Sequence, residues 1–240
     1  MRITQSYQDF GFYIIQSKLQ AMDPLNTPTY LRLREQIRSD IVSGVWALGS
    51  HVTLIKMSGH YGVSANPVRE ALLQLQGEGI VEMRMHRGAV IPSVDERYVD
   101  NIYKLRGALQ VMLAREAALR ATPAQIEALQ RLREAHESAA ATGDVAACVQ
   151  ANRALHHHMD SLADNAPALE VLASRCCLVD AFRRLHGYGA GRLDVVLTQH
   201  RKLVRAIARG DADKAAQAAF EHTESSRRDM LAALKPRAPA

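Results

Sequence analysis

Apolar residues recur every three or four positions through most of the chain from about Asp95 onward. This spacing is typical of amphipathic α-helices, and no convincing strand pattern interrupts it. Start and stop signals divide the segment into six helices. They fall at Ala121 with the capping box Thr122-Pro123-Ala124-Gln125, at Gly143-Asp144, at Asn165-Ala166-Pro167, at the glycine-rich stretch 187–191, and at Gly210-Asp211. The pattern predicts an antiparallel helical bundle.

The pattern is different between residues 28 and 94. A helix from about Leu31 stops at Gly44, a short helix is expected between Thr53 and His60, and a third helix follows Gly62. Two β-prone runs, 80–85 and 89–91, then enclose the basic tip His86-Arg87-Gly88. Three helices followed by a two-stranded wing predict a winged helix-turn-helix, whose third helix enters the major groove of DNA. The expected fold is therefore mainly α.

The start of the third helix is the most informative segment of the chain. Gly62 suits a tight turn with positive φ, and Ser64 suits an N-cap. Val68, Leu72 and Leu75 form an apolar stripe for packing. Arg69 points away from that stripe, so the helix is cationic on its exposed side. The alternative is an ordinary helix start with an exposed arginine.

Residues 29 to 92 resemble the DNA-binding domain of the GntR family of bacterial regulators. The signature helix of that family, S-R-T-P-V-R-E-A-L, stands here as Ser64-Ala65-Asn66-Pro67-Val68-Arg69-Glu70-Ala71-Leu72, with two departures, Ala65 and Asn66. Ala65 cannot contact guanine as arginine does, whereas Asn66 can still reach a phosphate or an adenine edge. Carried over by position, the resemblance implies DNA contacts by Ser64, Asn66 and Arg69 in the helix and by Arg87 and Gly88 in the wing.

Histidines are the informative residues of the helical segment. Asn152 and His156 are four residues apart, so their side chains share one helix face. His200 lies ten residues before Gly210 and His222 twelve after it, so a helical hairpin would bring them to nearly the same height. One amide and three imidazoles from three helices suit a divalent transition metal with positions left open. Accidental spacing among ten histidines is the alternative, and Asp160 is a rival carboxylate ligand.

Residues 98 to 232 resemble the FCD effector domain of the FadR-like branch of the GntR family. The resemblance rests on Tyr103-Lys104-Leu105-Arg106, on the segment from Asn152 to His156 with Asn165, and on the segment from His200 to His222. It implies a metal, such as Zn, Ni or Mn, held by Asn152, His156, His200 and His222. It also implies that Arg106 holds the carboxylate of a small effector, although a surface salt bridge is the ordinary alternative.

Length and composition limit the number of domains, the mode of DNA binding and the location of the protein. The 240 residues favour two domains, which we place at 28–94 and 95–240 after an N-terminal extension of residues 1–27. The net charge of +5 is spread along the chain, so DNA binding should depend on a placed helix. Three cysteines, no long apolar run and no signal-peptide pattern favour the cytoplasm and no membrane contact.

The sequence thus predicts a homodimeric, ligand-responsive transcription regulator that binds an inverted-repeat operator and responds to a small carboxylate near a metal. Two alternatives remain open at this point. An architectural DNA-binding protein with a purely structural helical domain would have an apolar bundle interior. A metal-dependent hydrolase would use the histidines to activate water, but no glutamate stands at HExxH-type spacing beside His156.

Overall fold

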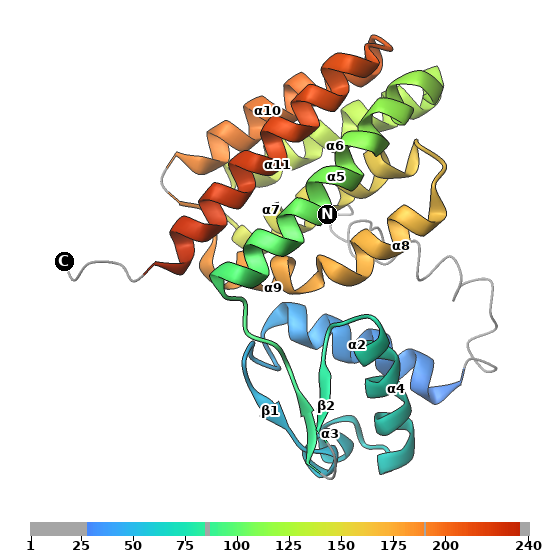
Figure 1. The fold of residues 1–240 in the computed structure, drawn as a ribbon, viewed down its shortest axis with the longest axis vertical. Coiled ribbons are helices and arrows are strands. Elements are labelled where there is room, and N and C mark those ends of the chain that lie inside the picture. The colour runs from blue at the N-terminus through green and yellow to red at the C-terminus, as the bar shows by residue number, and fades with distance from the viewer. Residues whose placement is uncertain (1–27, 85–86, 190, 236–240) are drawn as a thin grey trace, which may run out of the picture. The chain divides into compact units, whose positions relative to one another are not determined.

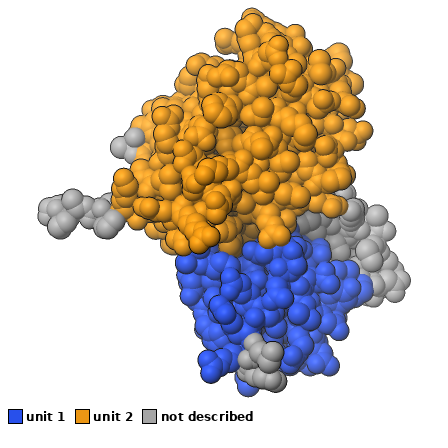
Figure 2. Space-filling model, viewed as in Figure 1, with its two compact units in different colours: residues 1–93 blue, residues 94–240 orange. Residues whose placement is uncertain are grey.

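The structure is a computed structural model that describes residues 28–84, 87–189 and 191–235. The chain divides into two compact units, residues 1–93 and residues 94–240 (Figure 2). The predicted N-terminal extension, residues 1–27, lies outside the described residues, as does His86 at the wing tip.

Unit 1 contains the three predicted helices, α2 (Thr29–Ser43), α3 (Leu54–Tyr61) and α4 (Ala65–Gly77). Gly44 and Gly62 end α2 and α3 in the left-handed conformation, at φ of 86° and 64°, as glycine permits. Thr53 caps α3 by accepting from the Lys56 amide. The predicted stripe of α4 is confirmed, because Val68, Leu72 and Leu75 are fully buried.

The sheet of unit 1 has one more strand than the predicted wing. The wing strands β2 (Glu82–Arg84) and β3 (Gly88–Val90) pair antiparallel, and β1 (His51–Val52) adds to the other edge of β3 in the order β1-β3-β2. Strand β1 has only two residues, which is too short for an alternation of apolar and polar positions to be visible in the sequence. Only its pairing with β3 makes it a strand. Gly88 has φ of 95°, and a Cβ there would lie 2.2 Å from the Val52 carbonyl oxygen. The close approach of β1 therefore requires glycine at this position.

The described part of unit 2 contains seven helices rather than the predicted six. They are α5 (Glu96–Arg120), α6 (Pro123–Ala141), α7 (Val145–Ser161), α8 (Ala166–Arg175), α9 (Cys177–His186), α10 (Arg192–Ala208) and α11 (Ala212–Leu234). The extra break falls at Cys176, where no glycine or proline marks it. Packing accounts for the break, since α8 contacts α5 and α7, whereas α9 buries Leu178, Val179 and Phe182 and contacts α7.

The helices of unit 2 form a bundle with α5 and α11 side by side (Figure 1). Helix α11 also pairs with α10, and α6 pairs with α7 and α10. The predicted capping box is confirmed, because the Thr122 hydroxyl accepts from the Gln125 amide while the Gln125 side chain accepts from the Thr122 amide. Asp144 and Asn165 cap α7 and α8 through their side chains. These local signals set where the helices begin, and the bundle brings α7, α10 and α11 together around one interior.

Candidate DNA interface, metal centre and effector pocket

The exposed side of α4 carries the predicted DNA contacts. Ser64, Asn66 and Arg69 are all exposed, whereas Val68, Leu72 and Leu75 of the stripe are buried. Ser64 occupies the N-cap with extended backbone, but its hydroxyl makes no capping hydrogen bond, contrary to what its position suggests. A hydroxyl that does not cap the helix is available to a phosphate oxygen.

The two predicted wing residues differ in exposure. Arg87 is exposed, whereas Gly88 is buried in β3 against Val52 and Thr53. The structure thus explains Gly88 by strand packing, and its contact with DNA stays a prediction. Arg84 of β2 is exposed and pairs with Glu82 at 3.0 Å.

Three of the four predicted metal ligands meet in the interior of unit 2. His156 of α7, His200 of α10 and His222 of α11 are 5%, 1% and 5% exposed. Each offers one nitrogen, and these nitrogens lie within 4.8 Å of one another. The Nε2 atoms of His156 and His200 are 3.2 Å apart. Among the described residues, no other group of three or more histidine, cysteine or acidic side chains brings its ligand atoms this close together.

The geometry and protonation of this histidine cluster fit a divalent metal. Two nitrogens that each lie about 2.1 Å from one ion are roughly 3.0–3.4 Å apart in octahedral or tetrahedral geometry, which includes the spacing of His156 and His200. Burial, together with the positive charges of Arg106 and Arg192, lowers the pKa of His222 to about 3. Burial and neighbouring positive groups also lower the pKa of His156 and of His200 well below the usual value. Neutral imidazole is the form that binds a metal.

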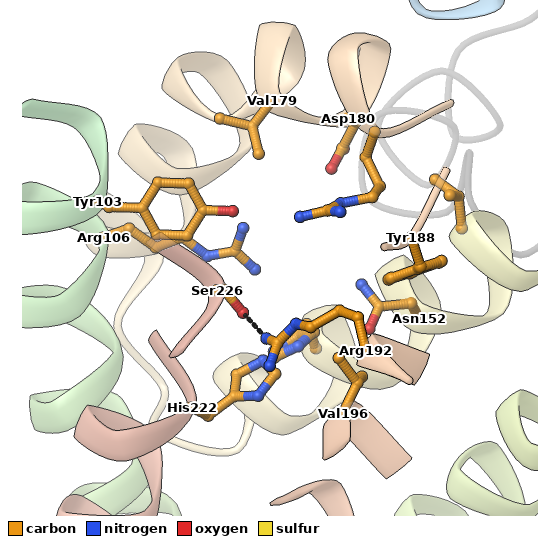
Figure 3. A pocket seen from close by; sticks show the side chains of 13 residues that line it. Tyr103, Arg106, Asn152, Val179, Asp180, Tyr188, Arg192, Val196, His222 and Ser226 are labelled. Atoms are coloured by element: carbon orange, nitrogen blue, oxygen red, sulfur yellow. Dashed lines mark hydrogen bonds between the residues drawn. The ribbon is translucent and has the colours of Figure 1, made fainter. Parts of the chain in front are cut away.

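Asn152, the fourth predicted metal ligand, and Asp160, the alternative carboxylate ligand, lie in different surroundings. Asn152 is half-buried one turn before His156 and lines a pocket together with His156 and His222 (Figure 3). Asp160 is one turn after His156, and its carboxylate accepts from the Gln110 amide at 3.3 Å outside the histidine cluster. Burial raises the pKa of Asp160 to about 7, which makes it a poorer metal ligand near neutral pH. Asn152 is therefore better placed than Asp160 to complete the cluster.

Gln110 connects the predicted effector arginine to the histidine cluster, and the sequence did not single it out. Arg106 donates from Nε to Gln110 Oε1 at 3.0 Å, and Gln110 Nε2 lies 3.3 Å from His156 Nδ1. Gln110 is buried and also accepts from the Thr223 hydroxyl. The spacing of four residues from Arg106 was the available signal. The contact between α5 and α7 that makes Gln110 a link is visible only in the folded chain.

The pocket above the cluster is rich in guanidinium groups. It encloses about 440 Å³, part of it open to solvent. Figure 3 shows Arg106, Arg192 and His222 around the same space. The lining residues are Tyr103, Arg106, Val149, Asn152, His156, Val179, Asp180, Arg183, Tyr188, Arg192, Val196, His222 and Ser226. Three arginines against one aspartate give these walls a net positive charge, which suits an anionic ligand.

Hydrogen bonds hold two of these arginines in place. Arg183 of α9 pairs with Asp229 at 2.6 Å, and Arg192 of α10 donates to the hydroxyl of Ser225. Arg192 also donates to the Ser226 hydroxyl (Figure 3). The sequence reasoning missed both arginines, because nothing in their local spacing connects them to Arg106. They converge only because α9, α10 and α11 enclose the same cavity.

Comparison with known proteins assigns the chain to a family. The sequence matches the FCD domain over residues 101–225 and the bacterial regulatory proteins of the gntR family over residues 29–91. This protein belongs to the GntR family. The FCD match alone covers more than half of the chain, so the resemblance read from Ser64–Leu72 and from the histidines is confirmed at the level of both domains.

Relatives of this GntR-family regulator match it along most of their length. The HTH-type transcriptional repressor RspR of Escherichia coli K12 is 24% identical over 210 residues, which cover 88% of this chain and 90% of RspR. The HTH-type transcriptional regulator YdhC of Bacillus subtilis 168 is 24% identical over 197 residues, covering 82% and 88%. The chain is thus similar to transcription regulators rather than to enzymes.

Solved structures support the fold of this regulator. McbR/YncC of E. coli has a TM-score of 0.74 at 20% identity, covering 85% of this chain and 97% of that protein. A GntR regulator from Rhodococcus sp. RHA1 has a TM-score of 0.70 at 18% identity, covering 86% and 99%. The mainly helical fold with an N-terminal winged helix-turn-helix is therefore confirmed.

The family assignment decides the class of function. The protein is a ligand-responsive, DNA-binding transcription regulator and not an enzyme. FCD domains are commonly associated with a metal, and the histidine cluster lies inside the FCD match. Across the residues that the structure describes, no helix is both long and apolar enough to span a membrane.

Proposed function

We propose that this GntR-family regulator is a metal-dependent sensor of a small organic acid. In this proposal Asn152, His156, His200 and His222 hold a divalent transition metal, and Arg106 binds the carboxylate of the effector. One observation carries it: His156 and His222 belong to the histidine cluster and also line the arginine-rich pocket. A ligand in the pocket would therefore reach both the metal and the guanidinium groups.

The donor set of three imidazoles and one amide suits a divalent metal such as Zn, Ni or Mn. Imidazole nitrogen suits Zn and Ni, and the amide adds a neutral oxygen ligand of the kind that Mn prefers. Four protein ligands leave positions open in a five- or six-coordinate site, which a carboxylate oxygen of the effector can occupy. An Asn152 amide donates less electron density than a carboxylate, so this site binds its metal less tightly than an aspartate-containing one would.

Arg106 suits the role of effector anchor. Its Nε is used by Gln110, so the two terminal nitrogens remain to grip a carboxylate in a bidentate manner. The guanidinium lies 5.8 Å from the Tyr103 ring centroid, which limits its freedom. Gln110 contacts both Arg106 and His156. A movement of His156 on metal binding would therefore be transmitted to Arg106 through the Gln110 side chain.

A thermal-shift screen of small carboxylic acids tests the proposal. At about 100 times its Kd, a specific effector should raise the stability of the metal-loaded protein by about 2.7 kcal/mol. Treatment with a chelator should abolish the shift. Arg106→Leu should lose the acid-dependent shift and keep the metal-dependent one, while Arg115→Leu is the matched control because Arg115 is an exposed α5 arginine outside the pocket. Acid shifts that are equal with and without chelator would contradict a metal-linked effector site.

DNA recognition in this proposal uses Ser64, Asn66, Arg69, Arg87 and Gly88 of each of two protomers. One short reading helix contacts too few base pairs for useful specificity, so a dimer on an inverted repeat is expected. The effector changes operator affinity only by binding one arrangement of the paired DNA-binding units more tightly than another.

An apolar stripe on α5 supports the homodimer. Leu105, Met112 and Leu119 lie seven residues apart, and their side chains are 41%, 38% and 64% exposed. They share the helix face opposite the buried residues Val99 and Ala117. Exposed leucines at heptad spacing on an otherwise packed helix suit contact with a second copy of the same helix.

Met112→Glu is expected to weaken the dimer by about tenfold or more, because the interface would bury an unpaired charge. Leu185→Glu on α9 is the control, since Leu185 is 72% exposed but lies away from the α5 stripe. Sedimentation equilibrium measures the dimer dissociation constant of each variant. A wild-type monomer, or an unchanged dimer constant for Met112→Glu, would remove the stripe from the interface.

The proposed location is the cytoplasm, where a regulator meets chromosomal DNA. Three free cysteines fit a reducing compartment. The alternative of a purely structural helical domain is disfavoured, because its interior would be apolar, whereas this bundle buries His136, His156, His200, His222, Gln110 and Asp160.

A further inference from the structure

A fourth buried histidine lies directly behind the histidine cluster. His136 of α6 is 0% exposed, and its Nδ1 is 3.2 Å from the Nδ1 of His200. Helices α6 and α10 are neighbours in the bundle, although the two histidines are 64 residues apart in the chain. Burying an imidazole completely is unfavourable unless its nitrogens have partners. The ring nitrogens of His136 therefore need hydrogen-bond partners inside the bundle, and these partners indicate what His136 does.

His136 is not a further ligand of the same ion. The Nε2 of His200 faces His156, whereas its Nδ1 faces His136. These two nitrogens point away from each other across the imidazole ring. An ion bound at Nε2 therefore lies on the far side of His200 from His136, which places His136 in the outer shell of the site.

The two hydrogen bonds of His136 can form one chain of donors that starts at His200. A neutral His200 that binds metal through Nε2 carries its proton on Nδ1 and donates it to Nδ1 of His136. The proton of His136 is then on Nε2, which lies 3.5 Å from the Sγ of buried Cys148. The thiol sulfur accepts this hydrogen bond. The opposite arrangement would put a proton on Nε2 of His200 and block the metal.

We propose that His136, supported by Cys148, is the positioning residue that holds His200 in its metal-binding tautomer. The inference rests on the proposed metal site and adds to it an outer-shell partner that determines which nitrogen of His200 is free. Outer-shell partners of histidine ligands typically change metal affinity by about 10- to 100-fold. His136 thereby sets how firmly His200 faces the metal without touching the metal itself.

A pair of substitutions separates this role from simple packing. His136→Leu fills the buried site with an apolar side chain but removes the acceptor. His136→Asn keeps an acceptor oxygen bonded to Cγ, as Nδ1 is, but places a polar amide in the interior. Leucine should thus be at least as stable as asparagine in the metal-free protein, whereas metal affinity should follow the reverse order.

The measurements are Zn²⁺ affinity by competition with a chromophoric chelator and the visible spectrum of the Co²⁺-loaded protein. His136→Leu is expected to bind Zn²⁺ about 10- to 100-fold more weakly and to shift the Co²⁺ bands, because His200 is no longer held. His136→Asn should stay within about threefold of wild type. Cys148→Ala should give a smaller loss than His136→Leu, because sulfur is a weak acceptor.

His158→Leu is the matched control. His158 of α7 also joins two helices, through its Nε2 and the Gln125 carbonyl at 3.1 Å, but it lies outside the cluster. Its loss should leave Zn²⁺ affinity unchanged. Equal affinities of wild type and His136→Leu, or equal losses in the leucine and asparagine variants, would overturn the proposal. A wild-type protein that binds no Zn²⁺ or Co²⁺ at all would instead overturn the metal site itself.

Discussion

Replacing His222 with alanine is expected to remove the metal and the effector response together while operator binding is retained. His222 is a buried member of the histidine cluster and also lines the arginine-rich pocket. Loss of a direct ligand should lower metal affinity on the order of 100-fold or more, since even outer-shell partners reach that range. The winged helix-turn-helix has its own buried core, so basal DNA affinity should change little.

Elemental analysis and effector titrations on operator DNA measure the two expected losses. His158→Ala is the control, because it removes a histidine of the same unit outside the cluster. If the wild type carries no metal under non-chelating conditions and His222→Ala answers the effector equally, the cluster is not a metal site. Asn152→Asp sharpens the result, because an added carboxylate should tighten the metal and repel an acidic effector. Unchanged values for both would remove Asn152 from the site.

Arg69→Ala is expected to weaken operator binding by about 1–3 kcal/mol and to relax the preference at one base pair. Arg69 is exposed one turn into α4, and it makes no hydrogen bond or ion pair with the described residues. Its guanidinium is thus available for bidentate contact with a guanine edge. Gel-shift titration at fixed salt, followed by site selection, measures the affinity and the preference separately.

Arg69→Lys distinguishes a base contact from a phosphate contact. Lysine keeps the positive charge but cannot grip guanine in the same planar manner. A base contact predicts that the lysine variant loses base preference nearly as alanine does, whereas a phosphate contact predicts near-wild-type affinity and a similar salt slope. If Arg69→Ala binds the operator as the wild type does, Arg69 has no role in recognition.

Local signals along the chain were sufficient for most of the helices. Thr122, Asp144 and Asn165 cap helices where the sequence predicts, because a cap depends on side-chain hydrogen bonds within three residues. Gly44 and Gly62 end helices for an equally local reason, since they adopt positive φ without strain. The buried stripe of α4 follows from periodicity alone.

The missed helix break and the missed strand share one cause, which is that long-range packing decided the outcome. The break at Cys176 has no local breaker and reflects the different partners of α8 and α9. Strand β1 exists only through its pairing with β3. The requirement for Gly88 likewise comes from Val52, which lies 36 residues earlier in the chain.

The residues of the site fall into the same two groups, those that local sequence signals predicted and those that only long-range packing brought in. The sequence alone predicted Asn152, His156, His200, His222 and Arg106 as site residues, because helical spacing and a hairpin turn relate most of these positions and the family resemblance supplies the rest. Only the tertiary structure brought in Gln110, His136, Cys148, Arg183 and Arg192. These residues act by what they touch on another helix, and contact between helices depends on the packed bundle, which no local spacing records. The proposed direct ligands could thus be predicted from the chain, whereas the side chains that contact them from other helices, and the further arginines of the pocket, were decided by the fold.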